Sequence, residues 1–199
     1  MTMRKFVLFC FSLLIAFVIF ASAPKGSQIS PLVRKGVSFP ITKTVRHLQP
    51  RLSWEEAHRH ALIIWKEAER SNLDWKLILS IAHLESSLWK FKGDWTCGFT
   101  SAQPDTYQCV HRSFGPMHVM FQFWRKTLKL DHQKLRDDLA YGYHVGVRIL
   151  ELKESTWSDT DPQWYARFNA RSKEFKDNYA RLIRKRLARI NRFLVKLKG

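Results

Sequence analysis

Apolar residues recur at three- and four-residue spacing along most of the chain after residue 52, which is the pattern of amphipathic helices. The Ser-Trp-Glu-Glu run at 53–56 is a capping box, so a first helix is expected to begin there and to end near Arg70. A second helix is expected from Asp74, a favourable N-cap, through Trp89. No segment shows clear two-residue alternation. The sequence therefore predicts a mainly α-helical domain.

The pattern continues towards the C-terminus. Four further helices are expected, over residues 117–128, 138–153, 162–168 and 173–197. The first of these follows a turn at Gly115-Pro116, because proline favours the first turn of a helix. Gly142 and Gly146 lie four residues apart and would let another helix pack closely against theirs. The last helix combines one apolar stripe with basic residues on its other faces.

The first 23 residues have the order of an export signal, because Arg4-Lys5 precedes an apolar run over residues 6–21. The small residues at 21–23 suit a signal peptidase, whereas Pro24 hinders cleavage. The run is also short for a helix that needs about 20 residues to span a bilayer. A cleaved signal peptide and a retained inner-membrane anchor both stay open. Either one places the folded part in the periplasm or cell envelope.

Two regions are expected to follow the export signal. Residues 24–51 contain four prolines and lack helical periodicity, so they are expected to form a linker. Residues 52–199 are expected to form one domain, because a chain of 199 residues has no room for two full cores. The net charge of +17 points to an anionic partner. Export argues against nucleic acid and leaves cell-wall polymers and the membrane surface.

Three cysteines fit an oxidising compartment. Cys10 lies in the apolar run, which leaves Cys97 and Cys109 to pair in the folded part. We expect a disulfide that closes the loop-like segment 98–108, worth about 3 kcal/mol. The alternative is two free buried thiols. The cysteine and histidine spacings do not suit zinc, so neither a metal nor another cofactor is expected.

Glu85 lies on the apolar face of the second predicted helix, where Ile81, Ala82 and Leu88 are its neighbours. Apolar surroundings disfavour the charged form of a carboxyl group and raise its pKa. An acid that stays protonated at neutral pH can deliver a proton to a glycosidic oxygen. The alternative is a boundary residue whose carboxyl head reaches water.

Four segments around Glu85 carry a resemblance to a known family. Residues 81–87, Ile-Ala-His-Leu-Glu-Ser-Ser, contain a Glu-Ser-Ser motif on a helix, and residues 113–119 look like a Gly-Leu-Met-Gln-hydrophobic motif. Residues 145–150 look like a helix that carries a glycine, and residues 167–171 are similar to an Ala-Tyr-Asn-Ala-Gly motif. In this order they resemble the catalytic domain of soluble-type lytic transglycosylases, which has a goose-type lysozyme-like fold.

The resemblance implies cleavage of peptidoglycan glycan strands. Glu85 would protonate the β-1,4 bond between N-acetylmuramic acid and N-acetylglucosamine and would then accept the proton of the muramoyl C6 hydroxyl, which leaves a 1,6-anhydromuramic end. No second carboxylate is needed, unlike in most glycosidases. The substrate-binding residues implied by the resemblance are Ser87, Met117, His118, Phe168 and Asn169.

This sequence departs from the family in five motif positions, two of which are Gly142 in place of an asparagine and Arg171 in place of a glycine. Pro116 and His118 replace the leucine and the glutamine of the second motif, and Phe168 replaces a tyrosine. Phe168 lacks the hydroxyl that the family's tyrosine directs towards the catalytic acid. We therefore expect a less firmly oriented Glu85. Because a histidine replaces the glutamine, we also expect activity to depend unusually on pH.

Other interpretations stay open. A hydrolytic muramidase of the same fold would need a second acid, for which Asp94 and Asp105 are the candidates. A non-catalytic peptidoglycan-binding or assembly protein is another alternative. The basic C-terminal helix is expected to dock on the domain, although it could instead lie on an anionic membrane. A partner in secretion, conjugation or phage assembly is compatible with a wall-cutting enzyme, as is ordinary wall turnover.

Overall fold

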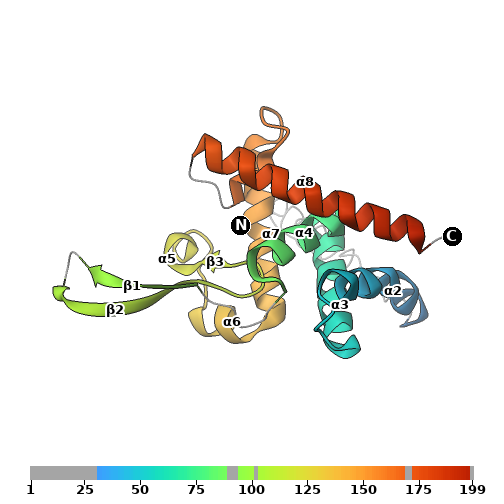
Figure 1. Ribbon diagram of the computed structural model, residues 1–199, viewed down its shortest axis with the longest axis horizontal. Helices are drawn as coiled ribbons and strands as arrows, with labels where there is room; N and C mark the ends of the chain where they lie inside the picture. The colour runs from blue at the N-terminus through green and yellow to red at the C-terminus, as the bar shows by residue number, and fades with distance from the viewer. Residues whose placement is uncertain (1–30, 89–93, 101–102, 169–171, 198–199) are drawn as a thin grey trace, which may run out of the picture. The chain divides into compact units, whose positions relative to one another are not determined.

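The computed structural model of the protein describes residues 31–88, 94–100, 103–168 and 172–197. The expected signal or anchor segment, residues 1–23, lies outside these ranges. Within the described ranges, no helix is long and apolar enough to cross a membrane. Residues 36–199 make up a compact unit, and the fold and the candidate site belong to it (Figure 1).

The unit is mainly helical, as the sequence predicts. Helix α3 (Trp54–Ser71) begins at the expected capping box, in which the Ser53 hydroxyl accepts from the Glu56 amide and the Glu56 carboxylate accepts from the Ser53 amide. Helix α4 (Trp75–Ser86) begins at the expected Asp74 cap. It ends three residues before the predicted Trp89, because Ser87 adopts a left-handed conformation with φ of 56°.

Helices α7 and α8 were also predicted. Helix α7 (Leu139–Trp157) begins at Asp138, whose carboxylate accepts from the backbone amides of the first turn. The short helix expected at 162–168 is a 3₁₀-helix, η1 (Trp164–Phe168). Helix α8 (Lys173–Lys196) is docked through its apolar stripe and contacts η1 and α4. The prediction that the basic terminal helix packs on the domain is therefore confirmed.

The expectation of a linker at 24–51 is wrong for residues 31–48. Residues Pro31–Leu48 form helix α2, in which Ile41, Val45 and Leu48 are buried at four- and three-residue spacing. Pro40 within this helix and the polar residues around it hid the short periodic run in the sequence. The compact unit consequently begins at Gly36 and not at residue 52.

The segment between the two cysteines is not a loop, which is a second correction. Strands β1 (Asp94–Thr100) and β2 (Gln103–Phe114) form an antiparallel hairpin, and β3 (Val119–Met120) pairs with the end of β2. The strands lack clean alternation of apolar and polar residues but are rich in threonine and aromatic residues, which favour strands. The hairpin brings Cys97 and Cys109 into register as Cα partners.

The third helix, expected at 117–128, is absent over most of that range. A turn spans residues 115–118, and β3 is followed by the four-residue helix α5 (Phe121–Trp124) and, further on, by α6 (His132–Asp137). Gly115 and His118 have φ of 73° and 47°, which lie in the left-handed region that a right-handed helix cannot contain. The turn therefore interrupts the apolar period that suggested a helix.

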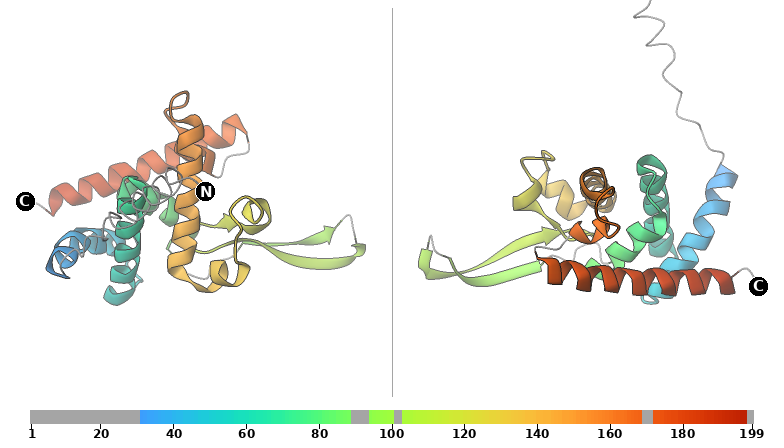
Figure 2. Two further views of the ribbon diagram at one scale, coloured as in Figure 1. Left: turned by 180° about the vertical axis from the view of Figure 1, so that it is seen from behind. Right: turned by 90° about the horizontal axis from the view of Figure 1, so that it is seen from above.

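The helices pack around α4 and α7. Helix α4 contacts α3 and α8, and α7 contacts α3, α6 and η1 (Figure 2). The middle of α4, residues 77–82, is buried on all sides. Such an environment explains why α4 is apolar nearly all round and shows only a weak helical stripe.

Candidate functional site

Glu85 lies in the last turn of α4, and 6% of its side chain is exposed. The carboxylate therefore faces the interior of the domain, as its place on the apolar helix face predicts. A buried carboxylate needs hydrogen-bonding partners, because removing it from water is costly. Two side chains from distant segments lie beside it.

The first is Tyr179 of α8, whose hydroxyl donates a hydrogen bond to Oε1 of Glu85. Burial, and then the neighbouring Glu85 carboxylate, raise the pKa of Tyr179 well above its usual value. The hydroxyl therefore keeps its proton at neutral pH. It is a permanent donor that fixes the orientation of the carboxylate.

The second is His118, the last residue of the turn at 115–118. Its Nδ1 lies 3.9 Å from Oε2 of Glu85, and 15% of its side chain is exposed. The two carboxylate oxygens thus have different neighbours, a tyrosine hydroxyl at one and an imidazole near the other. Such an arrangement can hold a carboxyl group in one orientation while a proton is exchanged.

Close packing against α7 fixes the turn that carries His118. A Cβ placed on Gly146 would lie 2.8 Å from Cβ of Met117, and one on Gly142 would lie 2.7 Å from Cδ of Pro116. The sequence suggested that the two glycines make room for another helix. In the structure they make room for this turn instead. Gly142 faces Pro116 and Gly146, one helical turn later, faces Met117.

A hydrogen bond joins the turn to the helix of the candidate acid. The buried hydroxyl of Ser86 donates to the carbonyl of Pro116 at 2.7 Å and also lies 3.1 Å from the carbonyl of Ala82. Ser86 is adjacent to Glu85, and Pro116 is two residues before His118. The first serine of the Glu-Ser-Ser run thereby holds the two halves of the site together.

The remaining predicted substrate-binding residues are placed differently. Ser87 is the left-handed C-cap of α4, and its carbonyl accepts from the Gln49 side chain at 3.0 Å. Met117 is fully buried against Gly146, so its side chain supports the turn and is not available to a substrate. Phe168 ends η1 and packs on a small core formed with Phe114 and Val145. Asn169 lies outside the described residues.

The positive charge of Arg186 interacts electrostatically with both Tyr179 and Glu85. Nε of Arg186 donates to Nδ1 of His83 at 3.2 Å. Burial, and then Arg186, lower the pKa of His83 to about 4, so its ring is neutral at pH 7 and can accept this bond. Burial lowers the pKa of Arg186, whereas Tyr179 and Glu85 oppose that shift electrostatically. Glu85 therefore lies within the field of a half-buried cation.

Tyr179 is the residue of this site that the sequence did not reveal. It appears there as one apolar position on the stripe of the last helix, 94 residues after Glu85. The available signal was the hydroxyl itself, because a buried tyrosine usually finds a hydrogen-bond partner. Only the fold shows which partner it is.

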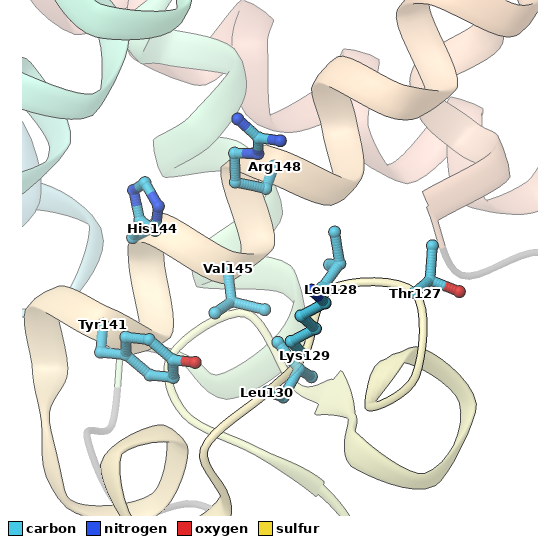
Figure 3. A pocket seen from close by; sticks show the side chains of 8 residues that line it. All are labelled: Thr127, Leu128, Lys129, Leu130, Tyr141, His144, Val145 and Arg148. Atoms are coloured by element: carbon cyan, nitrogen blue, oxygen red, sulfur yellow. The ribbon is translucent and has the colours of Figure 1, made fainter.

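A separate surface pocket of about 300 Å³ lies between α7 and the segment before α6 (Figure 3). Its lining residues are Thr127, Leu128, Lys129, Leu130, Tyr141, His144, Val145 and Arg148. Two of its basic side chains pair with carboxylates, His144 with Glu67 at 3.2 Å and Arg148 with Glu151 at 3.7 Å. None of the predicted site residues lines this pocket. The candidate site therefore stays at Glu85.

The candidates for a second acid lie in the hairpin. Asp94 begins β1 and is the Cα partner of Ser113, and Asp105 lies in β2. Within the described part of the chain, no group of three or more histidine, cysteine, aspartate and glutamate residues could hold a metal ion. A comparison of the chain with known family models, with curated proteins and with solved structures gives no match.

Proposed function

We propose that the protein is a peptidoglycan lytic transglycosylase with Glu85 as its single general acid and base. The observation that supports this most is the carboxylate of Glu85, which is nearly buried and is held between the Tyr179 hydroxyl and the His118 imidazole. A carboxyl group in such surroundings suits a reaction in which the same group first gives and then takes a proton.

The chemistry balances with one carboxyl group. Protonated Glu85 gives its proton to the oxygen that links N-acetylmuramic acid to N-acetylglucosamine, and the bond from that oxygen to the muramoyl C1 breaks. The muramoyl C6 oxygen then bonds to C1 while Glu85 accepts the C6 hydroxyl proton. The products are a strand ending in 1,6-anhydromuramic acid and a free N-acetylglucosamine end, and no water is consumed. No cofactor takes part.

Tyr179 removes one difficulty that the sequence raised. Phe168 cannot supply the hydroxyl that the family's tyrosine directs towards the acid, but Tyr179 supplies a hydroxyl to Glu85 from a different helix. His118 takes the place of an amide side chain near the second carboxylate oxygen. The altered motifs are therefore compatible with a functional acid.

The proposal also covers location and partners. We expect an exported protein in the periplasm or cell envelope, with residues 6–21 as a signal peptide or inner-membrane tether and peptidoglycan glycan strands as the substrate. A secretion, conjugation or phage-assembly system is the kind of partner that requires local opening of the wall.

The first test is the chemical nature of the ends that the full-length protein leaves on purified peptidoglycan. Mass spectrometry of the released muropeptides distinguishes the alternatives, because an anhydro end is one water lighter than a reducing end. Anhydromuramic ends support the proposal. Reducing ends would show a hydrolytic muramidase, and wall binding without any cleavage would favour a non-catalytic assembly protein.

A further inference from the structure

The outward side of α8 carries a row of cations between residues 181 and 196, and the sequence places no acidic residue in that interval. We name the exposed members of this row the basic face. They are Arg181, Arg184, Lys185, Arg189, Arg192 and Lys196. Arg186 is not included, because it is half-buried against His83.

The basic face is a straight, one-sided stripe. At 3.6 residues per turn its six members fall within an arc of about 140° and extend over about 22 Å along the helix. Of the buried residues of the same helix, Ile183 and Ile190 lie on the opposite side and Ala180 lies next to the edge of the stripe. The apolar stripe that could have entered a bilayer is therefore occupied by the domain. The cations are left directed outward.

The charge of this face is not balanced locally. Elsewhere in the unit, basic side chains meet carboxylates, as Arg70 does with Glu151 at 3.1 Å and Lys176 with Asp161 at 3.0 Å. Across the described residues, no ion pair involves a member of the basic face. Like charges three and four residues apart on a helix repel one another, so this arrangement is unfavourable without an external anion.

The positive field reaches the neighbouring helix. His47 of α2 stacks on Phe193 of α8, with ring centroids 4.1 Å apart. Burial lowers the pKa of His47, and Arg189 and Lys196 lower it further. Arg189 also donates to the carbonyl of His47 at 3.3 Å. The C-terminal half of α8 is thus fixed to α2 and presents its cations on a rigid support.

We propose that the basic face binds the surface of an anionic lipid bilayer. A plane can contact most of these cations at once, because they lie on one side of a straight helix, although Arg189 also donates to the His47 carbonyl. Val195, which is 72% exposed and lies within the same arc, adds an apolar side chain that can enter the headgroup region. The signal peptide or tether proposed at 6–21 would also bring this chain to a membrane. Lipid binding by the basic face is independent of the proposed catalytic function.

The test measures binding of the full-length protein to phosphatidylcholine vesicles and to vesicles of phosphatidylcholine mixed with phosphatidylglycerol. Any contribution of residues 6–21 is common to both, so the ratio of the two affinities isolates the charge effect. The test variant is Arg184→Gln/Lys185→Gln/Arg192→Gln. A cation near an anionic surface contributes about fivefold in affinity, so this variant is expected to lose about 100-fold of the preference for anionic vesicles.

The control variant, Lys66→Gln/Arg125→Gln/Lys134→Gln, removes the same charge from exposed positions outside α8. It should retain most of the preference, and circular dichroism should show both variants folded. If both variants lost the preference for anionic vesicles equally, the preference would depend only on net charge, and the proposal would be overturned. So would an unmodified protein that shows no preference for anionic vesicles but binds a soluble anionic polymer such as polyglutamate. Neither outcome depends on enzymatic activity.

Discussion

The contact between Gly146 and Met117 allows a quantitative prediction about the packing that supports the site. In Gly146→Ala the new Cβ would lie 2.8 Å from Cβ and 3.0 Å from Cγ of Met117. Met117 is fully buried and cannot move into solvent, so the turn that carries His118 must shift. The same substitution would otherwise stabilise α7, because alanine is a better helix former than glycine.

These two effects oppose each other. Overpacking a well-filled core costs about 1–3 kcal/mol, and replacing glycine by alanine within a helix contributes about 1 kcal/mol. We expect the free energy of unfolding to fall by roughly 1–2 kcal/mol, since a fully buried contact belongs in the upper part of the overpacking range. For a unit of this size that corresponds to a melting temperature lower by about 2–8 °C.

The assay is urea unfolding followed by circular dichroism, with a double-mutant cycle. Met117→Ala alone should cost about 2–5 kcal/mol, and the double variant should be less destabilised than the sum of the two by about 1–3 kcal/mol, because the clash is removed. Ser155→Ala, at an exposed position of α7, controls for helix propensity. Additive effects, or a Gly146→Ala variant more stable than the unmodified protein, would refute the close-packing argument.

Three further predictions concern a buried histidine, the candidate acid and the cysteines. Burial lowers the pKa of His60 to about 4, so on acidification its imidazole takes up a proton in the unfolded chain before it does so in the folded protein. The contribution of neutral His60 to stability is therefore complete above about pH 6.5. The free energy of unfolding should fall by about 2 kcal/mol from pH 7 to pH 5. Replacing His60 by glutamine should remove that part of the pH dependence in urea titrations, and an unchanged slope would contradict it. Tyr179→Phe removes the hydrogen bond to Glu85, and a hydrogen bond to a charged group contributes about 1.5–3 kcal/mol. The value of kcat/KM on peptidoglycan should therefore fall about 10- to 100-fold. Unaltered kinetics would show that the hydroxyl does not position Glu85. Alkylation of the unfolded, unreduced protein should leave Cys97 and Cys109 unmodified, because Cα partners in an antiparallel pair lie at disulfide distance, whereas alkylation of both would show free thiols.

The parts of the fold that the sequence predicted are those with local signals. Ser53, Asp74 and Asp138 each combine a capping side chain with an apolar period behind it, and each begins a helix where expected. Glu85 could be recognised because the residues three and four positions away from it are apolar, which is unusual for an acidic residue on a helix. Such signals depend only on residues within about four positions of one another.

The parts that the sequence missed depend on distant contacts. Helix α2 contains Pro40 and only a short periodic apolar run, and the burial of Ile41 and Val45 comes from the rest of the unit. The turn at 115–118 requires left-handed backbone at His118, which no pattern of apolar residues indicates. The bond from Tyr179 to Glu85 joins two helices far apart in the chain, so it follows only from how α8 docks.

The most direct test of the central claim compares Glu85→Gln with the unmodified protein in muropeptide mass spectrometry. Glu69→Gln, at an exposed position of α3, is the matched control for losing one carboxylate, and thermal unfolding shows whether each variant is folded. We predict that the unmodified protein and Glu69→Gln release 1,6-anhydromuropeptides and that folded Glu85→Gln releases none. Anhydromuropeptides at an undiminished rate from Glu85→Gln would contradict the assignment of Glu85 as the acid.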